Sequence, residues 1–281
     1  LDKISILEIK AMLYTSQSKM RDALDIATEA LSVLKVSLPK NPNDLSPLPE
    51  ILKIKLKLRN KPIQSLLNLP LLKNKEQLSI LRLLNACFAP SYISKPALFP
   101  IIALKMVNST LNYGISPISP FAFVAWGMIQ GSALGDFSLG YEFGKLAIDM
   151  VNKYKFEAIK SRVYFVFAFT VNHFKNHART SQPYLAESIQ SGMDNGDILY
   201  TAYSVNHIVF QSFSMRQNLA SVSEKFEHYR QIHIKLKQDD VRDMFSLIEQ
   251  ATFNLRGLSS DIFMLCGTVF DERITIPKWI D

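Results

Sequence analysis

The chain has 281 residues, of which 48% are hydrophobic, and its formal net charge is +7. This composition is typical of a folded globular protein and excludes a disordered segment. The longest strongly apolar run, residues 163–171, is far shorter than the ~20 residues that a membrane-spanning helix requires. The first residues lack the apolar region of a secretory signal, and position 1 is not Met. We therefore expect a fragment of a longer cytoplasmic protein.

The N-terminal residues have the pattern of two helices, over residues 2–16 and 21–36. The second helix would carry a broad face of small and apolar side chains that includes Ala23, Ala27 and Leu31. A helix, a short turn and an alanine-rich helix together form the unit of tetratricopeptide-like repeats. Residues 1–38 are thus predicted to be a first helical pair. Residues 39–74, which contain several prolines, are predicted to be a connector with short helices.

The positive charge is concentrated in residues 51–75, which contain no acidic residue and leave 25 basic against 25 acidic residues elsewhere. Residues 51–58 alternate apolar and basic side chains, a pattern that by itself predicts a strand. We predict a helix instead, because no partner strand is evident and Ser46-Pro47 is a good helix start. The stretch is either a solvated face or a surface for nucleic acid or anionic membranes. Its basic residues are Lys53, Lys55, Lys57, Arg59, Lys61, Lys73 and Lys75.

Residues 75–258 are predicted to form the main helical array, and residues 259–281 a tail that leads to a following domain. Apolar residues at helical spacing predict helices over 75–88, 98–113, 119–132, 136–154, 157–175, 181–195, 198–215, 221–237 and 240–256. Pro90 and Pro96 would bracket a turn, and Gly114 would end a helix. The predicted fold class is all-α, with antiparallel helix pairs stacked as a divergent tetratricopeptide-like array.

Two helices are expected to lie at the centre of this array. Gly140, Gly144 and Ala147 line one face of the helix over 136–154, so a neighbouring helix can approach it closely. The helix over 157–175 is apolar nearly all round at its centre, and we expect it to be the most buried element.

Few residues suggest chemistry. His173 and His177 have the i, i+4 spacing of zinc ligands on a helix, but no cysteine or acidic third ligand lies near them in the sequence. They are therefore either an interaction site at a helix end or, less plausibly, the metal centre of an enzyme. Tyr203 and His207 belong to an aromatic helix, where His207 would line a binding groove or be a hydrogen-bonded core residue.

No catalytic set is evident. The glycines form no phosphate-binding loop, and the thiolate of Cys87 would be desolvated among apolar neighbours. Cys87 and Cys266 are expected to be small, buried and reduced side chains rather than a disulfide. We therefore expect a segment that is not an enzyme and holds no cofactor.

Three stretches resemble a known family. They are residues 78–123, GDFSLGYEFGKLAIDM at 135–150 and VYFVFAFTVNHFKNH at 163–177, and the resemblance extends from about residue 29 to residue 277. They are similar to the helical region of very large signalling proteins of cyanobacteria, other bacteria and fungi. Those proteins join a serine/threonine-kinase-like domain, a STAND-type ATPase, this helical region, a GAF domain and a sensor histidine kinase.

The resemblance implies a position between the ATPase and the GAF domain. The catalytic residues of the family lie outside the helical region, so none is assigned to this chain. The implied role is a non-catalytic regulatory module that binds a protein or peptide, most simply other domains of its parent chain, and couples nucleotide state to kinase output. Binding of nucleic acid or an anionic surface, and a metal-dependent enzyme, are the alternatives.

Overall fold

A computed structural model describes residues 2–280, and helices dominate this part of the chain. No strand occurs among the described residues, where only two isolated β-bridges are found, Leu71 with Ile115 and Cys266 with Asp271. The all-α prediction is therefore confirmed. The α-helices are α1 (Asp2–Ser16), α2 (Met20–Val33), α3 (Leu48–Leu58), α4 (Lys75–Ser94), α5 (Phe99–Tyr113), α6 (Ser119–Ser132), α7 (Phe137–Tyr154), α8 (Glu157–Val166), α9 (Gln182–Asn195), α10 (Ile198–Ser214), α11 (Leu219–Leu236), α12 (Asp239–Leu255) and α13 (Glu272–Ile280).

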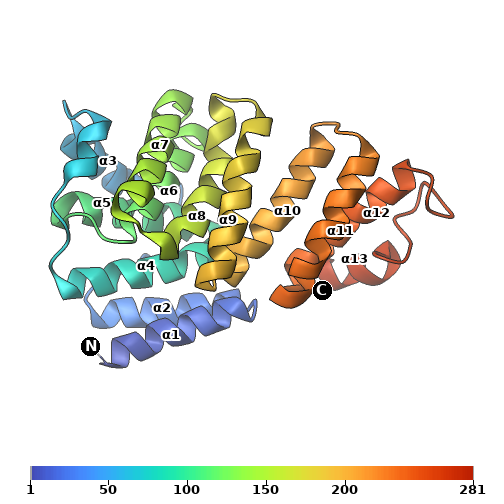
Figure 1. The fold of residues 1–281 in the computed structure, drawn as a ribbon. Coiled ribbons are helices and arrows are strands. Elements are labelled where there is room, and N and C mark those ends of the chain that lie inside the picture. Colours follow the sequence, from blue (N-terminus) through green and yellow to red (C-terminus); the bar gives the residue numbers. More distant parts are fainter. Residues whose placement is uncertain (1, 281) are drawn as a thin grey trace.

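Helices that follow one another in the chain mostly pack side by side (Figure 1). The pair α1 and α2 runs along one side of the molecule, where α2 contacts α4. The helices from α6 to α10 stand next to one another, and α11, α12 and α13 form the end opposite to α3. This order is compatible with stacked helical pairs, although a tetratricopeptide-like repeat remains a prediction.

The closest helix contact joins α6 and α7. A Cβ atom added at Gly127 of α6 would lie 2.6 Å from the carbonyl oxygen of Gly140 in α7, and the reverse substitution would meet the same obstacle. The predicted close approach is confirmed at both glycines: α6 makes it at Gly140, and Phe167 and Val171, which follow α8, make it at Gly144. Glycine is needed at the α6–α7 contact because the two backbones leave no room for a side chain.

The most buried helix is α6, so the prediction for residues 157–175 was wrong. Its side chains from Ser119 to Gly131 are buried with the exception of Met128, whereas several of residues 157–175 are exposed. Helix α6 is covered by α5, α7, α8 and the segment after α8. A helix surrounded on all sides must be apolar all round, and α6 meets this condition more fully.

The predicted helix over 157–175 is also interrupted. Helix α8 ends at Val166, and a π-helical segment (Phe167–Val171) and two short 3₁₀ segments (Asn172–Phe174 and Ala178–Ser181) follow. The hydroxyl of Ser181 donates to the carbonyl of Ala168 over 2.9 Å, and the amide of Asn172 donates to Ser181 over the same distance. The Ser181 hydroxyl thus supplies a partner for a backbone carbonyl beyond the end of α8. A bond to a residue 13 positions away leaves no mark in the apolar pattern, so the pattern alone did not reveal the change.

Two other boundaries differ from the sequence-based predictions. Helix α4 continues through Pro90 to Ser94 instead of ending near Phe88. The predicted tail contains the short helix α13. The prediction of a helix over residues 51–58 is confirmed, since α3 covers them and Pro47 is its N-cap residue.

Candidate functional site

An apolar groove of about 550 Å³ lies between α4, α8 with its π-helical segment, α10 and α12. Its volume lies within the range of small-ligand and peptide-anchor sites. We call it the aromatic groove and define it by six of its lining residues: Tyr92, Phe165, Phe169, Tyr203, Phe210 and Met244. No lining side chain that the structure describes carries a formal charge.

Two elements supply most of the rings. Helix α10 presents Tyr203, His207 and Phe210 on one face, because residues three and four apart are neighbours on a helix. The π-helical segment brings Phe169 opposite to them, with its ring centroid 4.5 Å from that of His207. Phe165 stacks on Phe169 at 5.4 Å and on Tyr203 at 5.7 Å. The two elements thus form one continuous aromatic wall, and Tyr203 and His207 are both part of it.

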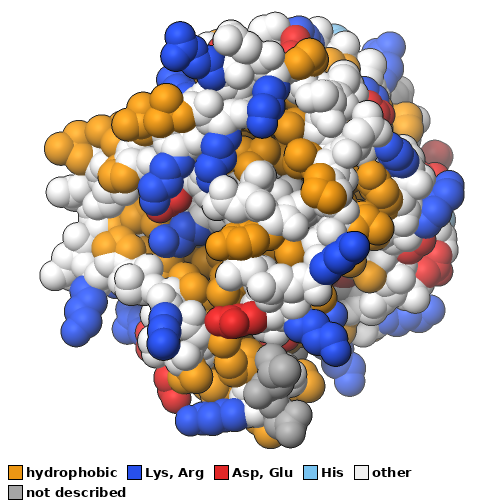
Figure 2. All heavy atoms as spheres, turned by 90° about the vertical axis from the view of Figure 1, so that its left-hand side faces the viewer, with side chains coloured by type: hydrophobic (Ala, Val, Ile, Leu, Met, Phe, Trp, Pro, Cys, Tyr) orange, Lys and Arg blue, Asp and Glu red, His pale blue; other side chains and the backbone are white. Residues whose placement is uncertain are grey.

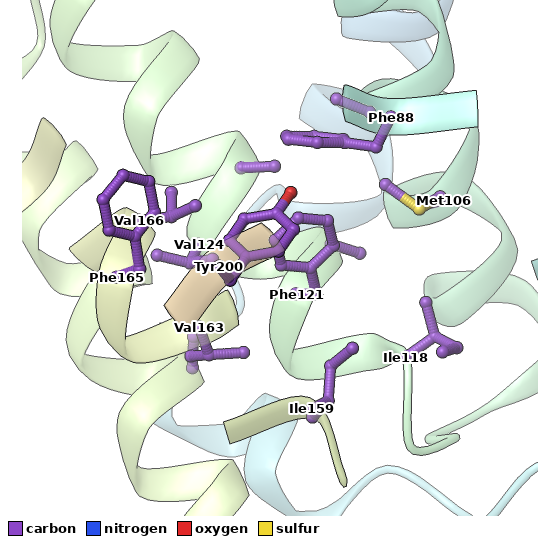
Figure 3. Packing of buried hydrophobic residues seen from close by; sticks show 14 of the residues in the cluster. Phe88, Met106, Ile118, Phe121, Val124, Ile159, Val163, Phe165, Val166 and Tyr200 are labelled. Carbon is purple, nitrogen blue, oxygen red and sulfur yellow. The ribbon is translucent and has the colours of Figure 1, made fainter. Parts of the chain in front are cut away.

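Tyr200 lies at the base of the groove. Its ring lies between those of Phe121 and Phe165, at 6.0 and 5.9 Å (Figure 3). The guanidinium of Arg162 lies over the ring at 5.1 Å, and its Nε donates to Asp197 Oδ2 over 2.6 Å. Burial raises the pKa of the Tyr200 phenol. The base is therefore a neutral phenol held between rings and one ion pair.

His207 is a neutral, hydrogen-bonded wall residue. Its Nε2 lies 3.1 Å from Nε2 of Gln211. Burial, with a contribution from the nearby His173, lowers the pKa of His207 to about 4, and burial also lowers the pKa of His173. Both interpretations of His207 from the sequence hold in part, since it is partly buried and also lines the groove.

The helical spacing assumed for His173 and His177 is absent from the structure. The two residues do not share a helix face, because His173 is in a 3₁₀ segment and His177 is the N-cap of the next. Nδ1 of His177 accepts from the backbone N–H of Arg179 over 3.1 Å. Within residues 2–280, no group of three or more His, Cys, Asp or Glu side chains is arranged to hold a metal ion.

The basic residues of the connector fall on α3 and are not equivalent. Lys53 pairs with Glu50 at 2.9 Å, and Lys57 donates to Oδ1 of Asn108 in α5 over 3.1 Å. Lys55 and Arg59 are exposed and have no acidic partner among the described residues. Part of the basic stretch thus fastens α3 to the fold, and part is free at the surface.

Two buried polar residues lie behind the groove. Asp197 stands at the N-cap of α10, but its carboxylate binds Arg162 instead of a helix amide. His233 is 1% exposed, and its Nε2 lies 2.7 Å from Oδ1 of Asn206. The thiol of Cys87 is buried as expected, and burial raises its pKa to about 12. Cys266 was also expected to be buried, but it is only partly buried.

Sequence reasoning missed Phe169, Phe210 and Met244 as site residues. They are 41%, 45% and 52% exposed although all three are large and apolar. Phe210 belongs to the same helical face as Tyr203 and His207, so that face was a usable signal. The positions of Phe169 and Met244 depend on the π-helical segment and on the packing of α12 next to α10, neither of which has a local signature.

The chain is similar to part of one signalling protein. It is 30% identical over 137 residues to "Hybrid signal transduction histidine kinase G" of Dictyostelium discoideum. The match covers 45% of this chain and only 4% of that protein. No family model and no solved structure matches the chain. Among the described residues, no helix is both long and apolar enough to span a bilayer.

Proposed function

We propose that this chain is a non-catalytic regulatory module of a large, cytoplasmic signal-transduction kinase. Its helices would act as a tetratricopeptide-like scaffold that couples an ATPase domain to kinase output. Two findings support the proposal: the all-α fold and the similarity to a small part of a hybrid histidine kinase. A segment that amounts to 4% of such a protein leaves ample length for separate catalytic domains.

The observation that carries the proposal is the aromatic groove. It exposes large apolar side chains from three helical segments that are separate in sequence, including Phe169, Phe210 and Met244. Exposed apolar patches of this kind mark interaction sites, because water contact makes them unfavourable in a free surface. The uncharged lining favours an apolar anchor.

The occupant that fits best is the apolar face of an amphipathic helix from another domain of the parent protein. Helices dock into apolar grooves through anchors spaced by one turn. Met128 and Met244 line the groove, and methionine adapts its shape to such anchors. His207 and Tyr200 are neutral, so neither presents a charge to an apolar side chain.

The test uses the full-length parent kinase with Phe210→Glu and Met244→Glu. A carboxylate in the groove should prevent docking. The rate of autophosphorylation should then no longer respond to the nucleotide that is bound to the ATPase domain. Both side chains are about half exposed, so the melting temperature should change little. Leu255→Glu, at a 65% exposed position outside the groove, is the matched control. Unchanged coupling in the double variant, with the control also unchanged, would contradict the proposal.

A further inference from the structure

Helix α3 exposes a stripe of leucines that no part of the described chain covers. Leu48, Leu52 and Leu56 follow one another at intervals of four residues and are 51%, 59% and 62% exposed. Leu45, three residues before the start of the helix, is 67% exposed. The opposite face is the one that packs inward, since Ile54 is fully buried. We call the exposed set the leucine stripe.

The inward face of α3 is fixed firmly. Nδ2 of Asn108 in α5 donates to Oε2 of Glu50 over 2.7 Å, and Lys57 donates to Oδ1 of the same amide. The amide thus binds both ends of the inward face, and Lys105 adds an ion pair with Glu50 at 3.8 Å. The orientation of α3 is therefore set by α5, and the leucine stripe is held outward.

Basic residues share the outward face. Lys55 and Arg59 follow Leu48 by seven and eleven residues, which returns them to nearly the same side of the helix. Beyond α3, Lys61, Lys73 and Lys75 are also exposed. Figure 2 shows this end of the molecule, where Lys and Arg side chains lie among hydrophobic ones and acidic side chains are few. Leucine and positive charge are thus presented together.

We propose that the leucine stripe and its basic residues bind the surface of an anionic lipid bilayer. A helix lying in the membrane interface inserts its apolar side chains below the headgroups while Lys and Arg contact the anionic lipids. The two components occur here on one outward face of α3. Binding of this kind requires no membrane-spanning segment. The aromatic groove is formed by other helices and stays available to a protein.

Two other polyanions fit the face less well. Nucleic acid is bound by basic grooves with stacking aromatic side chains, and α3 contains leucines but no aromatic residue. Protein interfaces are depleted in lysine and concentrate their binding energy in tryptophan, tyrosine and arginine. A lipid surface uses both features that α3 does have, namely aliphatic side chains and lysines.

The experiment measures co-sedimentation of the 281-residue chain with vesicles of phosphatidylcholine alone or mixed with phosphatidylserine. Binding should require phosphatidylserine and weaken with added salt, because the attraction is screened. Lys55→Gln with Arg59→Gln should weaken binding by roughly five-fold for each charge removed. Leu52→Ser with Leu56→Ser should weaken it at low and at high salt. All four side chains are exposed, so melting temperatures should stay within the error of the parent chain.

Matched controls lie at the opposite end of the molecule. Lys235→Gln with Lys237→Gln removes two exposed charges from the end of α11, and Leu255→Ser removes an exposed leucine from α12. These variants should bind vesicles like the parent chain. Three results would overturn the proposal. They are equal binding to vesicles with and without phosphatidylserine, a loss of binding in the control variants as large as in the α3 variants, and no binding to either kind of vesicle at low salt. Tighter binding to duplex DNA that the α3 variants abolish would overturn it in favour of nucleic acid.

Discussion

The α6–α7 contact and the aromatic groove contain the same kinds of side chain, but the contact is a closed core and the groove is an open surface. At the contact, the rings of Phe123 and Trp126 lie 6.0 and 6.3 Å from that of Phe143, and all three residues are 0% exposed. In the groove, Phe169 and Phe210 make similar ring contacts and remain more than 40% exposed. Aromatic clustering therefore does not distinguish a core from a binding surface, whereas the completeness of the cover does.

The largest expected effect comes from emptying one ring position in each region. Phe143→Ala should lower the free energy of unfolding by about 3–5 kcal/mol, because it leaves a cavity between close-packed helices. Phe210→Ala should lower the free energy of unfolding by much less, since Phe210 is already 45% exposed to water. Urea denaturation of both variants measures the difference. Equal losses would show that the groove is part of the core.

Overpacking tests the other side of the comparison. A Cβ atom at Gly144 would lie 2.6 Å from Cγ1 of Val171 and 2.8 Å from Cδ2 of Phe167. Gly144→Leu should therefore destabilise the fold by about 1–3 kcal/mol or more. The control is Met128→Leu, which changes the shape of a groove side chain at nearly constant volume. Gly196→Leu is unsuitable as a control, because the positive φ of Gly196 would strain any larger residue. Comparable melting temperatures for the two variants would contradict the prediction.

Sequence periodicity was sufficient for the fold class because most helices bury one face. Ala23, Ala27 and Leu31 are all fully buried on α2, as their spacing predicts. Periodicity failed where side chains compete with the backbone for hydrogen bonds. Ser181 binds the carbonyl of Ala168 across 13 residues, and no local pattern reveals a partner at that distance. The break after Val166 was therefore invisible.

Acid should loosen the end of the molecule around α11 and α12. Burial, with the charge of Arg242, lowers the pKa of His233 from 6.5 to about 4. The unfolded chain thus binds a proton between pH 6.5 and 4 that the folded chain does not. The contribution of His233 to the free energy of unfolding is therefore fully present above pH 6.5. It decreases as the pH falls, by about 2 kcal/mol at pH 5.

Urea midpoints at pH 7.5 and pH 5 measure this loss. His207 changes in the same direction, since its pKa is also about 4. His233→Gln should reduce the pH dependence, although it also disturbs the bond to Asn206. His228→Gln, at an exposed position of the same helix, should leave the dependence intact. A parent chain equally stable at both pH values would refute the assignment.

The candidate site was only half predictable. Tyr203 and His207 were identified because they share one helix face with other aromatics, and that face does line the groove. The other lining side chains, from α12 and the π-helical segment, reach the groove through tertiary packing. A single-helix pattern can reveal one wall of a groove, but the second wall depends on how distant helices are placed.

The smallest expected effect concerns the two histidines that first suggested a metal. His177→Ala removes an N-cap acceptor for the N–H of Arg179, and N-cap losses cost about 1 kcal/mol in a full helix. The segment that it caps is a short 3₁₀ helix, so we expect less. His173→Ala removes an edge contact with Phe174, whose ring centroid lies 5.0 Å away. Thermal melting of the double variant, with and without chelator, measures both effects. We expect a mild shift in the melting temperature and no response to the chelator; a stability loss on chelation in the parent chain that the double variant lacks would restore the metal hypothesis.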